Sequence, residues 1–154
     1  MIITFVGHGK MHIDIELTEK LVSIIKDNIQ GKDSISFYCG GYGDFDNHCA
    51  TICRKLKPYI SQCEIVFITP YISFTQQEKM KYLIETNLYD SIIYPPIEHI
   101  PPRFAILKRN EWIVSKADLI IAYVCRTYGG AYKTLEYARR KNKTIINLAE
   151  KERS

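Results

Sequence analysis

Six short apolar runs, each separated from the next by a longer amphipathic stretch, constrain the fold of this chain most strongly. Most of the runs are apolar at consecutive positions, as expected for parallel strands that helices cover on both faces. The runs that we expect to form strands are residues 2–6, 34–39, 63–69, 91–94, 118–124 and 143–148. Apolar residues at helical spacing predict helices at residues 16–30, 45–57, 75–87, 102–116 and 131–142.

Six strands joined by five helices predict an α/β fold, namely a Rossmann-like, doubly wound parallel sheet of about six strands with helices on both faces. A length of 154 residues with 46% hydrophobic content is enough for one core. The sequence contains no linker or internal repeat, so we expect one domain over residues 1–154.

Composition restricts the classes of partner. The net charge of +4 is modest, so we expect an anionic small ligand and no nucleic acid. No apolar run approaches the roughly 20 residues that cross a bilayer, and the chain opens directly in a strand, so we expect a cytoplasmic protein with reduced thiols and no membrane partner. Cys49 and Cys53 lie on an apolar stripe, beside His48, without a second pair at zinc spacing. We therefore expect no metal and no cofactor.

Glycine is concentrated directly after three of the predicted strands. The loops are Gly7-His8-Gly9, then Gly40-Gly41-Tyr42-Gly43, then Gly129-Gly130 at the start of a helix. The carboxyl ends of parallel strands meet at one rim, where ligands bind in such sheets and helix N-termini hold anions. None of the loops matches GxGxxG or GxxxxGK[ST]. We therefore expect a ligand site at this rim that differs from the standard dinucleotide and ATP sites.

Single residues near this rim allow more than one role. Asp44 is placed to cap the second helix and Asp46 to lie in its first turn, although either carboxylate has the chemistry to bind ribose hydroxyls. His8 is placed either to bind a ligand or to be satisfied by loop carbonyls. Asn110 falls on a stripe with Ile106, Ile113 and Ala117, so its buried amide needs a partner in the loops or in a ligand. Tyrosines close to the expected cleft are Tyr42, Tyr94, Tyr128 and Tyr132.

Several of these segments resemble the SLOG superfamily of Rossmann-like proteins. The similarity lies in residues 3–8, 38–46, 109–110, 118–124 and 129–138, and so spans nearly the whole chain. The superfamily includes the lonely guy phosphoribohydrolases, the DNA-processing protein DprA and small uncharacterised bacterial proteins. The resemblance implies the fold, with members that range from enzymes to ligand sensors.

The lonely guy motif supplies candidate catalytic residues. That family carries an arginine nine residues before a strand-opening aspartate, followed by PGGxGTxxE; here Arg109 precedes Asp118 by nine residues, and Glu136 matches the final glutamate. Tyr128 replaces the proline, and Lys133 is placed to take over an anion contact. In a second register, which resembles nucleoside deoxyribosyltransferases, Thr134 takes the nucleophile position.

Three functions remain open at this point. The first is binding, as a sensor or carrier, of a nucleotide or nucleotide-derived small ligand at the C-terminal rim. The second is an N-glycosidase acting on nucleoside monophosphates through Glu136 and Arg109. The third is a single-stranded DNA-binding module. We also expect a homo-oligomer, as in the related families. The expected ligand-binding residues are Gly7, His8, Gly40, Gly41, Asp44, Asp46, Asn110, Gly129, Gly130, Lys133 and Thr134.

Overall fold

The computed structural model describes residues 1–149 and contains one six-stranded, all-parallel sheet in the order β4-β3-β2-β1-β5-β6. The predicted fold class is thus confirmed. The strands are β1 (Ile2–Gly7), β2 (Ile35–Cys39), β3 (Cys63–Ile68), β4 (Ser91–Ile93), β5 (Leu119–Tyr123) and β6 (Thr144–Asn147). The last five residues of the expected 1–154 domain lie outside the described range.

Five α-helices connect the strands, each within three residues of its predicted bounds. They are α1 (Ile15–Ile29), α2 (Asp44–Leu56), α3 (Phe74–Glu85), α4 (Ala105–Lys116) and α5 (Gly130–Arg140). The sequence places Pro102 in the first turn of a helix over 102–116, but residues 102–104 form a separate 3-10 turn that precedes α4. Pro58 lies in a second 3-10 turn, which follows α2.

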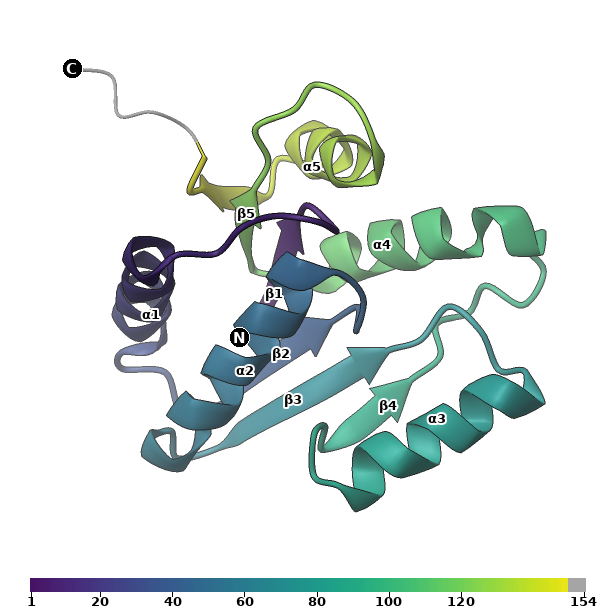
Figure 1. Cartoon of the computed structure of the whole chain (residues 1–154), viewed down its shortest axis with the longest axis horizontal. Coiled ribbons are helices and arrows are strands. Elements are labelled where there is room, and N and C mark those ends of the chain that lie inside the picture. The colour runs from purple at the N-terminus through teal and green to yellow at the C-terminus, as the bar shows by residue number, and fades with distance from the viewer. Residues whose placement is uncertain (150–154) are drawn as a thin grey trace.

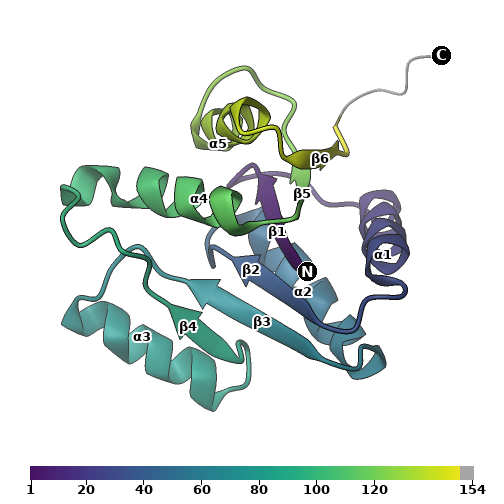
Figure 2. The same cartoon turned by 180° about the vertical axis from the view of Figure 1, so that it is seen from behind.

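Alternate residues of each strand build two layers of core. Ile3, Phe5 and Phe37 pack with the buried stripes of α1 and α2, and Leu83 of α3 joins the same cluster. Val6 and Ile120 point the other way and pack against α4 and α5. In Figure 1 α2 lies in front of the sheet, and in the reversed view of Figure 2 it lies behind it. Helices therefore cover both faces, as the sequence predicts.

The strand order changes direction at β1, which pairs with β2 on one side and with β5 on the other. The chain passes from β1 to β2 through α1, which packs on one face of the sheet. It enters β5 from α4, which packs on the opposite face. Such a switch point leaves a crevice at the carboxyl ends of the strands, because the two adjoining loops diverge. The fold thus brings the loops after β1, β2 and β5 to one place. Within residues 1–149 no helix is both long and apolar enough to cross a membrane.

Candidate functional site

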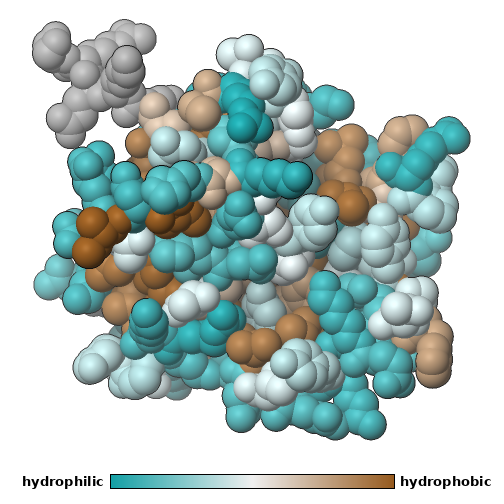
Figure 3. Space-filling view, viewed as in Figure 1, coloured by the Kyte–Doolittle hydropathy of each residue, from teal (hydrophilic) through white to brown (hydrophobic). Residues whose placement is uncertain are grey.

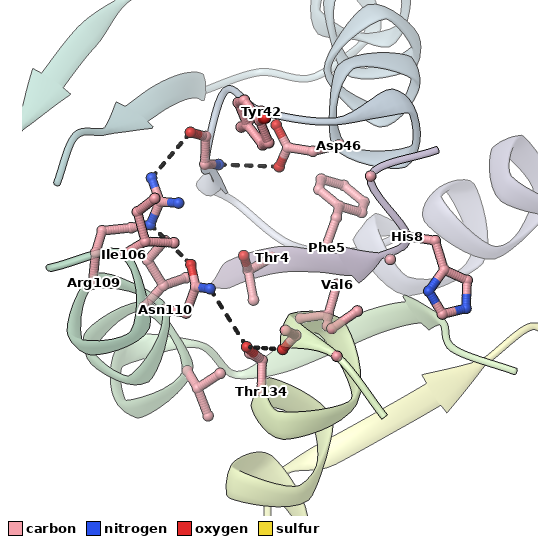
Figure 4. Close-up of a pocket in the computed structure, with 18 of the residues that line it drawn as sticks. Thr4, Phe5, Val6, His8, Tyr42, Asp46, Ile106, Arg109, Asn110 and Thr134 are labelled. Carbon is pink, nitrogen blue, oxygen red and sulfur yellow. Dashed lines mark hydrogen bonds between the residues drawn. The ribbon is translucent and has the colours of Figure 1, made fainter. Parts of the chain in front are cut away.

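A pocket of about 310 Å³ lies at this switch point. Its walls come from β1 and the loop that follows it, the loop after β2, one side of α4, the loop after β5 and the start of α5 (Figure 4). Of the thirteen residues predicted to be catalytic or ligand-binding, nine line it: Gly7, His8, Gly40, Asp46, Arg109, Asn110, Gly129, Gly130 and Thr134. Four others, Gly41, Asp44, Lys133 and Glu136, are not among the lining residues.

The loop after β2 is held by the carboxylate of Asp46. The Gly40 amide donates to Oδ1 at 3.0 Å and the Gly41 amide donates to Oδ2 at 2.8 Å. Gly41 has a φ of +70°, and a Cβ there would lie 2.2 Å from the ring of Phe67. Only glycine fits this backbone conformation in this space. Asp46 therefore shapes one wall of the pocket.

Burial raises the pKa of Asp46, because the charged carboxylate loses its hydration. The amides of Gly40 and Gly41 and the positive charge of Arg109 act in the opposite direction. Asp46 is also the only carboxylate among the residues that line the pocket.

Asp44 differs from the expectation. The residue that caps α2 is Gly43, which offers no side-chain oxygen, and Asp44 is already the first helical residue. Its Oδ2 instead accepts the Met11 amide at 3.0 Å and so ties the loop after β1 to α2. The predicted N-cap at Asp44 was therefore wrong by one position, whereas Asp46 does lie in the first turn.

Arg109 is 5% exposed, and it donates from Nη1 to the carbonyl oxygens of Gly40 (3.0 Å) and Ile68 (2.8 Å). Its Nε donates to Oδ1 of Asn110 at 2.9 Å. Burial lowers the pKa of Arg109, and the charge of Asp46 opposes that change. The neighbouring carboxylate on α4, Glu111, pairs with Lys108 and not with Arg109. Arg109 links the ends of β2 and β3 to α4.

The buried stripe of α4 agrees with the sequence prediction only at its C-terminal end. Ile113 of the helix and Ala117 after it are buried as predicted, but Asn110 is half-buried and Ile106 is 49% exposed. The other buried residues of α4 are Ala105, Arg109 and Val114. Asn110 Nδ2 lies 3.5 Å from Oγ1 of Thr134, which donates to the Gly130 carbonyl at 3.0 Å. In Figure 4 Asn110 and Thr134 point toward each other across the pocket floor. This contact joins α4 to the first turn of α5.

The loop before α5 presents glycines without close neighbours. Gly129 caps α5 with a φ of +90°, and nothing lies within 4 Å of a Cβ built at Gly129 or at Gly130. The first amides of an α-helix lack intrahelical acceptors, and the helix dipole makes this end attractive to anions. The start of α5 is therefore the wall of the pocket that is best suited to a negative charge.

His8 is 5% exposed, and its Nε2 accepts the Cys125 amide at 3.1 Å. The partner is thus an N–H group after β5, and the loop carbonyls named in the sequence argument are not used. Burial and the nearby charge of Arg126 lower the pKa of His8, which keeps the ring neutral near pH 7. In Figure 4 its ring points away from Asp46, Asn110 and Thr134.

Lys133 and Glu136, the two charged residues of α5 that the comparison with the lonely guy motif selected, do not line the pocket. Lys133 is exposed. Glu136 is half-buried and pairs with Arg139. Of the proposed catalytic pair, only Arg109 lines the pocket.

Other lining residues were not selected from the sequence. They include Thr4 and Arg126. Thr4 carries no distinctive signal, but Arg126 lies between the end of β5 and the glycine pair, a position from which a cation faces the rim. Tyr42 and Tyr128, expected near the cleft, do line it, whereas Tyr94 lines a separate hollow with Tyr71.

His48, Cys49 and Cys53 form no metal cluster within residues 1–149, and both cysteines are fully buried in the core.

Comparison with known proteins matches this fold. The chain is similar to DNA processing protein A from Helicobacter pylori (TM-score 0.64, 13% identity, all of this chain and 67% of that one). It is also similar to the Streptococcus pneumoniae protein of that name (TM-score 0.57, 14% identity, 93% and 48%), and to TM1055 (TM-score 0.55, 11% identity, 94% and 71%). At these identities the neighbours confirm the Rossmann-like α/β fold.

In sequence, the chain is 25% identical over 143 residues to the uncharacterized SPbeta prophage-derived protein YoqJ of Bacillus subtilis (strain 168), which covers 82% of each protein. No protein-family model matches the chain.

Proposed function

We propose that this chain, which shares the Rossmann-like fold of the SLOG superfamily, binds a nucleotide or nucleotide-derived small ligand at the carboxyl rim of its sheet and acts as a sensor or carrier. One observation carries the proposal: three loops that are remote in sequence line a single pocket at the switch point of the sheet. Its volume of about 310 Å³ is at the small end for ligand sites, which favours a mononucleotide over a dinucleotide.

Opposite walls of the pocket offer different chemistry to such a ligand. The carboxylate of Asp46 accepts hydrogen bonds and suits hydroxyl groups, whereas the start of α5 at Gly129 and Gly130 suits an anion. Figure 4 shows Asp46 and Thr134 on opposite sides of the cavity. The backbone of Gly7 and Gly40 and the amide of Asn110 complete the proposed contacts.

A ligand panel tests this proposal. We expect at least one ribonucleoside monophosphate to raise the melting temperature of the purified chain, by the mass-action relation that gives about 2.7 kcal/mol at a hundredfold excess over Kd. Native mass spectrometry of freshly purified protein adds a search for a ligand retained from the cell. A panel without any stabilising nucleotide, together with a ligand-free mass spectrum, would contradict the proposal.

The glycosidase alternative makes a different prediction with the same ligands. It requires a carboxylate at the reacting bond, and Glu136 does not line the pocket. We therefore expect no free base when the chain is incubated with AMP, GMP, CMP or UMP and the products are separated by chromatography. Base release that disappears in Glu136→Gln but persists in Asp46→Asn would restore the enzymatic alternative.

A single-stranded nucleic acid is the second candidate, and the exposed aromatic residues of the rim favour it. Tyr42 is 82% exposed and Tyr128 is 69% exposed, and both line the pocket. Bases of single strands stack on such rings. DNA processing protein A from Helicobacter pylori, which shares the fold, binds single-stranded DNA. Most of the face seen in Figure 3 is hydrophilic, with separate apolar spots. Against this candidate, the net charge of the chain is only +4, whereas such sites carry a strongly positive groove.

Fluorescence anisotropy with a labelled oligothymidine separates the two candidates. Binding that is lost in the double variant Tyr42→Ala, Tyr128→Ala, but kept in Tyr59→Ala, would favour the nucleic acid. Tyr59 is the matched control because it is 86% exposed and lies in another pocket.

The homo-oligomeric state and the cytoplasmic location remain predictions. Sedimentation velocity measures the first and cell fractionation tests the second.

A further inference from the structure

Two hydrogen-bond donors of Cys125 converge on one ring nitrogen of His8. The Cys125 amide donates to Nε2 at 3.1 Å, and the Cys125 Sγ lies 3.4 Å from the same atom. Because an accepting Nε2 carries no proton, the proton of the neutral ring is on Nδ1. The thiol, as the second donor, therefore directs its hydrogen at Nε2. Within residues 1–149 no other side chain hydrogen-bonds to His8.

Cys125 also differs from the other cysteines in its exposure. All five cysteines lie within residues 1–149, and Cys125 is the one that is exposed. Burial raises the pKa of each of the other four thiols, which keeps them protonated; they are Cys39, Cys49, Cys53 and the half-buried Cys63. Cys125 is thus the thiol that a reagent from solution reaches most directly.

The surroundings of this thiol favour its reaction as a nucleophile. Burial lowers the pKa of His8, and the nearby charge of Arg126 acts in the same direction, so Nε2 is free to take a proton near pH 7. Arg126 follows Cys125 directly in the chain, and a cation beside a cysteine stabilises the thiolate. An exposed thiol within hydrogen-bond reach of a neutral imidazole is the arrangement of an activated nucleophile.

This pair lies at the edge of the pocket. Cys125 is not among the lining residues, whereas its neighbours His8 and Arg126 are. A group attached to Sγ would therefore extend from the rim, beside two side chains that face the cavity, and the thiol is distinct from the ligand contacts proposed above.

We propose that Cys125 and His8 form a site of reversible thiol modification, at which a low-molecular-weight disulfide such as glutathione disulfide forms a mixed disulfide with Sγ. In this step His8 takes the thiol proton, a bond forms between Sγ and one sulfur of the reagent, and the S–S bond of the reagent breaks. The leaving thiolate then takes the proton from His8. This inference goes beyond the proposed function, and it stands or falls whatever the pocket binds.

Intact-mass spectrometry of the native chain, incubated with glutathione disulfide, tests the site. We expect the mass to rise by one glutathionyl group and to return to its starting value with dithiothreitol. Cys125→Ser should take up no group. Cys63→Ser is the matched control, because it removes the half-buried thiol, and it should react as the wild type does. An undiminished adduct in Cys125→Ser, or no adduct on the wild-type chain, would overturn the inference.

The rate of adduct formation at about pH 7.5 tests the role of His8. His8→Gln keeps an acceptor for the Cys125 amide but cannot take a proton, so the rate should fall by about tenfold or more. A merely loosened loop would expose the thiol further and would not slow the reaction. His48→Gln is the control, because His48 bonds to Thr18 and its pKa is also lowered by burial. A wild-type rate in His8→Gln, or an equal loss in His48→Gln, would overturn the assignment of His8.

Discussion

The two glycine loops at the carboxyl rim, residues 40–43 and 129–130, read alike in the sequence but are packed very differently. In the first, Gly41 lies against Phe67 and the amides of Gly40 and Gly41 are bound by Asp46. In the second, neither Gly129 nor Gly130 has a neighbour within 4 Å of a built Cβ. The first loop therefore uses its glycines to complete the fold, and the second leaves its helix amides available for a ligand.

The largest effect that tests this contrast is expected for Gly41→Ala. A side chain at positive φ costs roughly 1–2 kcal/mol, and the clash with Phe67 adds roughly 1–3 kcal/mol. We expect the free energy of unfolding, measured in urea, to fall by about 3 kcal/mol. Gly31→Ala is the control, because Gly31 also has a positive φ but has open space around it. Its loss should be about 1 kcal/mol. Equal losses in the two variants would contradict the packing argument.

A somewhat smaller loss is expected for Asp46→Asn. The asparagine oxygen accepts one hydrogen bond, but its NH₂ group faces the other loop amide, which leaves a buried donor unsatisfied. The unfolding free energy should fall by about 2 kcal/mol. Asp44→Asn makes the same chemical change at an exposed residue that accepts one amide. If the two variants are equally stable, the first loop is not held by Asp46.

These two aspartates also show how far sequence reasoning reaches. Apolar runs and helical spacing predicted every strand and helix, because burial on one or both faces leaves a period in the sequence. Spacing alone did not distinguish Asp44 from Asp46 as the residue that binds the glycine loop, since the path of the loop decides which carboxylate reaches its amides.

The charged residues of α4 and α5 carry the same lesson. Helical spacing places Arg109 beside the buried stripe of α4, but in the structure Arg109 is part of that stripe. Its guanidinium is buried because hydrogen bonds to the carbonyl oxygens of Gly40 and Ile68 replace those that it would make with water. Those oxygens belong to the loop after β2 and to the last residue of β3, both remote from α4 in sequence. The motif-based alignment proposed Glu136 as catalytic, whereas this carboxylate is not among the residues that line the pocket. It lies two residues beyond Thr134, which lines the pocket, and so on a different side of α5.

A pH effect should follow from the connection between the loops after β1 and β5. Burial and Arg126 lower the pKa of His8 below the value of about 6.5 in an unfolded chain. The unfolded chain therefore binds the proton first as the pH falls through about 6.5, and stability decreases. His8→Gln should lose less unfolding free energy than the wild type between about pH 7.5 and about pH 5. His48, whose pKa burial also lowers, stays in both proteins.

The smallest effect is expected at the second glycine loop. Gly130→Ala adds a methyl group in open space at the first position of α5, where alanine is the better helix former. Its unfolding free energy should stay within about 0.5 kcal/mol of the wild type, or rise by about that amount. A loss as large as that of Gly41→Ala would remove the contrast between the loops.

Amide chemical-shift mapping during a titration with nucleoside monophosphates tests the central claim most directly. We predict that the amide signals of Gly7, Gly40, Gly130 and Thr134 shift together, with one common Kd, because these residues line one pocket. The signals of Gly31 and Ser61, which line a different pocket, should remain in place. Shifts confined to Gly31 and Ser61, or scattered without a common Kd, would contradict a ligand site at the switch point.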